Sequence, residues 1–166
     1  MPETDLLLSL AEIAGVFLGF GALISIRSAG TSDAYELTYI RGVVAMGTYV
    51  IVAALAPVTL SHYGITGHEV WLLSSLVFVA VFWGTFAVEI VRVPESRAVG
   101  LATPWARRAV SGLLYVPMNV ALVLVVLGLF PAQEPALYLT AVGLLLVLAA
   151  SFLLSLAYSF GRPQTA

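Results

Sequence analysis

The 166-residue sequence contains no cysteine, no lysine and very few charged residues. Without cysteine, disulfides, thiolate metal sites and thiol chemistry are all excluded. Only 10% of the residues are charged, whereas a soluble domain carries about 25%. So few charges cannot cover a water-exposed surface. The net charge of −2 also offers no basic surface, so a nucleic acid is not an expected partner.

Motifs typical of an enzyme site are also missing from the sequence. It has no hydrolase nucleophile elbow, phosphate-binding loop, H-E-x-x-H or C-x-x-C. The two histidines, His62 and His68, flank a single predicted turn and give no Ser/His/Asp set. We therefore expect neither an enzyme nor a bound cofactor.

Long apolar runs dominate the sequence, which is 61% hydrophobic and has a mean hydropathy of +1.04. A bilayer core of about 30 Å needs about 20 apolar residues in a helix. Five runs meet this requirement: residues 6–26, 39–61, 70–91, 109–130 and 136–160. The sequence therefore predicts an all-α polytopic membrane protein. Its residues 1–166 form one domain, a bundle of five transmembrane helices.

The basic residues support this count and give an orientation. All seven are arginines, and with five spans they all fall on one side: Arg27, Arg41, Arg92, Arg97, Arg107, Arg108 and Arg162. The positive-inside rule makes that side cytoplasmic. We therefore expect the N-terminus outside and the C-terminus in the cytoplasm.

The composition and the N-terminus also bear on location. Arginine in place of lysine, with many Ala, Val and Leu residues, is typical of a GC-rich bacterial genome, which predicts a bacterial inner membrane protein surrounded by lipid bilayer. The acidic start lacks the positive region of a signal peptide, so we expect the first helix to remain in the mature protein.

Glu12 is the most unusual residue of the predicted spans. It lies about six residues, or roughly 9 Å, inside the first span, where a carboxylate facing lipid costs a few kcal/mol. We therefore expect it to face protein or water. The predicted neighbours at a similar depth are Pro57, Thr59, Ser74, Ser75 and Thr140, and His62 is the nearest candidate base. A structural hydrogen bond, a proton or ion pathway, and a lipid or partner contact all stay open.

Gly15 and Gly19 lie on the same helical face as Glu12 and form a G-x-x-x-G pattern, which permits close approach of two helices. This predicts that one stripe of the first helix is protein-facing. Five short spans rarely enclose a pore within one chain, so the stripe also favours a homo-oligomer.

Two prolines lie inside the predicted spans, and so do the candidate polar residues Asn119 and Glu89. Pro57 and Pro117 each remove a helical hydrogen bond and are expected to kink or pack their helices. Asn119 lies close to Pro117 and is a candidate for lining a cavity. Glu89 stands three residues before Arg92, which indicates an ion pair at the inner end or an acidic cytoplasmic mouth.

The predicted outer turn is a candidate pH or metal site. His62 and His68 flank it, with Glu69 adjacent, and two imidazoles with a carboxylate can bind zinc or titrate near pH 6. The alternative is a pair of ordinary interfacial histidines. Trp83, near the middle of the third span, is interpreted as a packing or lipid contact.

The first helix carries two resemblances. Residues 11–20, AEIAGVFLGF, resemble the start of small bacterial inner-membrane proteins of unknown function, which implies no activity. Residues 10–15 are also similar to the first helix of small multidrug resistance transporters. In that family a membrane-embedded Glu exchanges protons for cationic drugs, which implies such a role for Glu12 alone. This chain departs from that family in its greater length and in five predicted spans rather than four.

Together these patterns predict a homo-oligomeric channel or transporter for an ion, proton or small solute. Glu12, Asn119 and Glu89 are its candidate pathway residues. The alternative is a non-transporting accessory or assembly subunit, or a sensor of lipid or pH.

Overall fold

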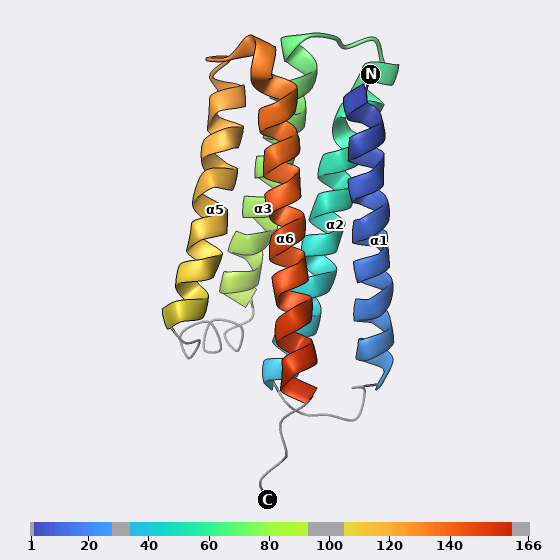
Figure 1. Cartoon of the computed structure of the whole chain (residues 1–166), viewed down its shortest axis with the longest axis vertical. Helices are drawn as coiled ribbons and strands as arrows, with labels where there is room; N and C mark the ends of the chain where they lie inside the picture. Colours follow the sequence, from blue (N-terminus) through green and yellow to red (C-terminus); the bar gives the residue numbers. More distant parts are fainter. Residues whose placement is uncertain (1, 28–33, 93–104, 161–166) are drawn as a thin grey trace, which may run out of the picture.

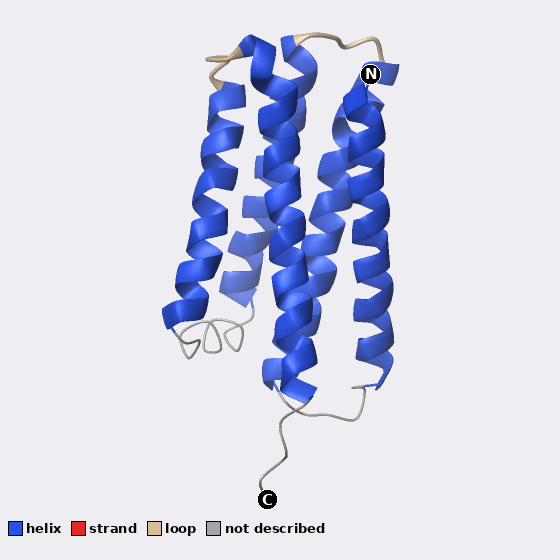
Figure 2. Ribbon diagram, viewed as in Figure 1, coloured by secondary structure: helices blue, strands red, loops and turns tan. Residues whose placement is uncertain are grey.

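The computed structural model describes residues 2–27, 34–92 and 105–160, and all regular structure in these ranges is helical (Figure 2). The elements are α1 (Pro2–Arg27), α2 (Ala34–His62), α3 (His68–Arg92), α5 (Trp105–Val126), the short 3₁₀ turn η1 (Pro131–Gln133) and α6 (Glu134–Phe160). The prediction of an all-helical chain with five long helices is confirmed for the described residues.

Four of the helices are long and apolar enough to cross a bilayer. Their apolar segments are Glu3–Ile26, Ile40–His62, His68–Val88 and Pro131–Ser155. In α5 the corresponding segment is shorter, Ser111–Val126. The described chain therefore has the helices of a multi-pass membrane protein.

The five helices lie side by side and alternate in direction (Figure 1). α1, α3 and α6 run one way, and α2 and α5 run the other way. As a result, Pro2 and Phe160 lie at opposite ends of the bundle. The last residue of α1, Arg27, and the last residue of α3, Arg92, lie at the same end as the start of α5.

Glycines with positive φ end α2 and α5. Beyond α5, Gly128 has φ 61°, its amide donates to the Val125 carbonyl, and the Leu129 amide donates to the Leu124 carbonyl. This is the Schellman pattern, in which a left-handed residue satisfies the last helical carbonyls. Gly64, with φ 81°, follows α2 with the same pattern. α5 therefore ends four residues before the end predicted at position 130.

The core is centred on α6, which contacts each of the other four long helices. Its fully buried side chains follow the three- and four-residue spacing of one helical face: Tyr138, Ala141, Val142, Leu145, Leu148 and Ala149. This stripe packs against buried side chains of α2, α3 and α5 in one hydrophobic cluster. In a bilayer such a cluster gains from close packing rather than from removing apolar surface from water.

α1 packs against α2 and α6 along a narrow seam. Leu7, Ala14 and Gly21 are its buried residues, spaced seven residues apart. Most other side chains of α1 are exposed in the single chain, including Val16 and Leu23. The helix therefore presents a wide face away from the bundle.

Two glycines of α2 allow close approach of its neighbours. A Cβ atom at Gly47 would lie 2.9 Å from Leu18 Cγ of α1, and a Cβ atom at Gly42 would lie 2.8 Å from Phe152 Cδ1 of α6. Both separations are shorter than van der Waals contact, so only glycine fits without a shift. These positions fix how closely α1 and α6 pack against α2.

Candidate functional site

Glu12 lies on the exposed face of α1, away from the bundle. Among the described residues it makes no hydrogen bond and no ion pair. Ser74, Ser75 and Pro57, expected at a similar depth, are instead buried inside the bundle. The expectation that Glu12 meets other helices of its own chain is therefore not met.

In the described part of the bundle, Gly15 and Gly19 do not pack against another helix of the same chain. Both are exposed, and a Cβ atom added at either would meet no atom within 4 Å. Within the chain α1 packs through its other small-residue face, at Ala14 and Gly21. Glu12, Gly15 and Gly19 thus form one exposed stripe, which we call the α1 stripe.

Pro57 is buried in α2, and its missing amide leaves the Ala53 carbonyl without a helical donor. The Tyr138 hydroxyl of α6 donates to this carbonyl oxygen at 2.7 Å. Tyr138 and Ala53 are both fully buried. The tyrosine therefore replaces the hydrogen bond that the proline removes, and it ties α6 to α2 inside the apolar core.

Pro117 lies inside α5, and the nearby amide of Asn119 faces a neighbouring helix. The Asn119 side chain donates to its own helix at the Tyr115 carbonyl (2.8 Å) and accepts from Trp83 Nε1 of α3 (3.0 Å). The mid-span tryptophan is thus a packing residue with a specific polar contact. The predicted link between Asn119 and a polar cavity finds no support in these bonds.

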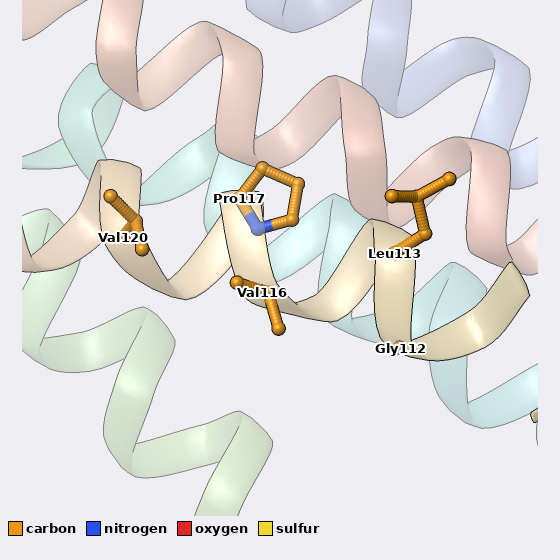
Figure 3. A pocket seen from close by; sticks show the side chains of 5 residues that line it. All are labelled: Gly112, Leu113, Val116, Pro117 and Val120. Atoms are coloured by element: carbon orange, nitrogen blue, oxygen red, sulfur yellow. The ribbon is translucent and has the colours of Figure 1, made fainter. Parts of the chain in front are cut away.

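A shallow groove runs along α5 beside Pro117 (Figure 3). It is lined by Gly112, Leu113, Val116, Pro117 and Val120. All five are apolar, and Leu113 and Val116 are largely exposed. This surface fits lipid chains and offers no group that binds an ion.

A buried carboxylate joins α3 to α6 at the end of the bundle where α1 begins. Glu134, only 2% exposed, lies 2.6 Å through Oε1 from Nδ1 of His68, whose side chain is 43% exposed. Gly128 closes over this pair, since a Cβ atom there would lie 3.2 Å from the imidazole. Sequence reasoning singled out His68 but missed Glu134, because the partner lies 66 residues away.

The other candidates of the outer turn do not join this pair. His62 bonds through Nδ1 to the Val58 carbonyl of its own helix, and Glu69 is exposed. Among the described residues no three His, Asp or Glu side chains gather closely enough to hold a metal ion. Glu89 lies in α3, but its side chain is outside the part of the chain that the structure describes.

Comparison with known proteins finds no match for this chain among protein-family models, curated proteins or solved structures.

Proposed function

We propose that the chain is a bacterial inner-membrane protein with five spans that assembles through the α1 stripe into a homo-oligomer. In this assembly it acts as a small channel or transporter for an ion, a proton or a small solute. The observation that carries the proposal is Glu12, an exposed carboxylate within a 24-residue apolar segment and beside two exposed glycines.

The energetics of the carboxylate favour an assembly. An ionisable group inside the bilayer is costly against lipid, and such groups generally face protein or a water-filled path. The rest of the bundle does not cover Glu12, so a second copy is the simplest neighbour. Gly15 and Gly19 leave room for that copy's helix, because nothing in the chain lies within 4 Å of their Cβ positions. A polar path then runs between copies, past Glu12.

Five spans with the N-terminus outside are supported by helix direction and by the arginines. α5 runs beside the other helices, and its 22 residues give a length of about 33 Å at 1.5 Å per residue. The ends of α1 and α3 that carry Arg27 and Arg92 lie at the same end of the bundle as the start of α5, which holds Arg107 and Arg108. Basic residues at one end of the bundle favour that end as cytoplasmic.

Flux measurements in liposomes test the transport role. The wild-type protein is expected to conduct protons or monovalent ions above protein-free vesicles, and Glu12→Gln is expected to lose most of that flux. Glu69→Gln is the matched control, since Glu69 is exposed in the first turn of α3, at the very end of its apolar segment. Equal flux in both variants and wild type would remove Glu12 from the pathway.

The apolar interior favours a second candidate, a non-transporting accessory subunit whose α1 stripe docks a helix of another protein. In the described core the buried polar side chains are Ser74, Ser75 and Glu134. This candidate predicts no flux of any ion tested. It also predicts that Gly19→Leu reduces co-purification with the partner, whereas Gly84→Leu does not, since Gly84 is exposed on α3.

A further inference from the structure

Ser74 and Ser75 of α3 are unusual among the polar residues of this bundle. Both side chains are fully buried, and neither hydroxyl has a hydrogen-bond partner. They are the side chains in the described residues whose buried polar atoms have no partner. A buried hydroxyl without a hydrogen-bond partner lowers the stability of the fold by roughly 1–3 kcal/mol, and a bound ligand would remove this cost.

Other hydroxyl groups in the helices of this chain form hydrogen bonds to their own helix. Ser61, Thr140 and Ser151 each donate to a carbonyl three or four residues earlier in their own helix, at 2.7 Å. Thr48 does the same at 2.8 Å. In membrane helices this local bond is the usual solution for serine and threonine. Ser74 and Ser75 instead keep both hydroxyls free for another group.

The two serines lie between aromatic residues that pack against Tyr138. Trp71 and Phe78 precede and follow them on the same face of α3, and both rings pack against Tyr138, with centroids 5.6 and 6.4 Å away. The serines therefore lie at the level of Tyr138, whose hydroxyl bonds the carbonyl freed by Pro57. One turn before Tyr138 in α6 is Glu134, paired with His68.

We propose that Ser74 and Ser75 form a buried water-binding site between α3 and α6. Each hydroxyl offers one donor and two acceptors and carries no charge, so the ligand that matches them is neutral and both donates and accepts. Water has these properties and makes about three bonds when buried. The buried core also contains small side chains, Ala54 and Ala141. This site lies inside one chain and does not depend on the α1 stripe.

Single cysteines give a direct test, because the chain has none of its own. Ser74→Cys and Ser75→Cys preserve the size of the side chain, and Ala54→Cys and Ala141→Cys are controls in fully buried apolar positions. Methyl methanethiosulfonate is a small reagent that reacts with the thiolate, which forms where water solvates the sulfur. We expect reaction at the serine positions to be about tenfold faster than at the alanine positions. Equal rates at all four positions would overturn the proposal.

Thermal stability gives a second test, because the Tm of a double alanine variant changes in opposite directions with and without a bound water. If water bridges the hydroxyls, changing both Ser74 and Ser75 to alanine removes its bonds and lowers the Tm by several degrees. If the hydroxyls are simply unpaired, the same change removes an unsatisfied group and raises the Tm. Ser151→Ala is the control for loss of a self-bonded hydroxyl. A higher Tm in the double variant would refute the water site and would leave the proposed role of Glu12 unaffected.

Discussion

The bond between Tyr138 and the Ala53 carbonyl gives the sharpest prediction from this structure. Tyr138→Phe removes one hydroxyl from a fully buried site and leaves the carbonyl without a donor, because the residue four positions later is Pro57. The remaining aromatic ring still packs against Trp71 and Phe78. The change therefore isolates a hydrogen bond rather than a packing defect.

The expected loss follows from two magnitudes. A buried carbonyl left unsatisfied costs about 1–3 kcal/mol. Side-chain hydrogen bonds between membrane helices average about 0.6 kcal/mol and reach about 1.7 kcal/mol. Because the bond is short, at 2.7 Å, and the carbonyl has no helical donor, we expect Tyr138→Phe to cost about 1–2 kcal/mol, at the upper end of the membrane range.

Pro57→Ala supplies the control for this mechanism. Alanine restores an amide four residues after the Ala53 carbonyl, so the carbonyl regains a helical donor. In this background Tyr138→Phe should cost about 0.5 kcal/mol, which gives a coupling energy of roughly 1 kcal/mol between the two positions.

SDS-induced unfolding in mixed micelles measures these free energies of unfolding. The fluorescence of Trp71 follows the transition, because its ring packs on Tyr138. Tyr49→Phe makes the same chemical change at another buried tyrosine, one whose hydroxyl has no bond in the described structure. The reasoning is refuted if Tyr138→Phe costs no more than Tyr49→Phe, or if its cost is unchanged by Pro57→Ala.

Two further substitutions test the packing and the contact between His68 and Glu134 by the same unfolding assay. Gly47→Ala should destabilise the protein by about 1–3 kcal/mol, because the new methyl would meet α1 at 2.9 Å, whereas Gly84→Ala has open space and should change little. His68→Ala leaves the buried Glu134 without its partner and should cost about 1.5–3 kcal/mol, whereas His62→Ala removes only a bond to its own helix at an exposed position.

The helices themselves were predictable from the sequence because hydrophobicity and length decide them. The five predicted segments match the five long helices, of which four are long and apolar enough to cross a bilayer, and the main error is the end of α5. There the apolar run continues to residue 130, but Gly128 adopts a left-handed conformation and ends the helix first. A run of apolar residues carries no sign of this turn, since glycine is also common within membrane helices.

The orientation of α1 was not predictable to the same degree. This helix has two faces of small residues, one with Ala14 and Gly21 and the other with Gly15 and Gly19. Spacing alone cannot decide which of them packs against the chain. The structure places the first in the core, and Glu12 falls on the opposite side.

The polar contacts of the core needed the tertiary structure. Pro57 predicted a carbonyl without a donor, but its donor, Tyr138, comes from a helix 85 residues away from Ala53. Glu134 lies just before the predicted span 136–160 and was not singled out, and its partner His68 comes from α3. Such partners depend on which helices are neighbours and on their relative rotation, and neither property is encoded in local sequence.

The two glycines of α2 limit how this bundle can move. Gly42 receives an aromatic ring from α6, and Gly47 receives an aliphatic side chain from α1. These positions face different directions around one helix axis, so a roll of α2 would drive backbone against both neighbours at once. The rotation of α2 about its own axis is therefore restricted. Any rearrangement that accompanies activity must come from tilting or sliding of the helices around it.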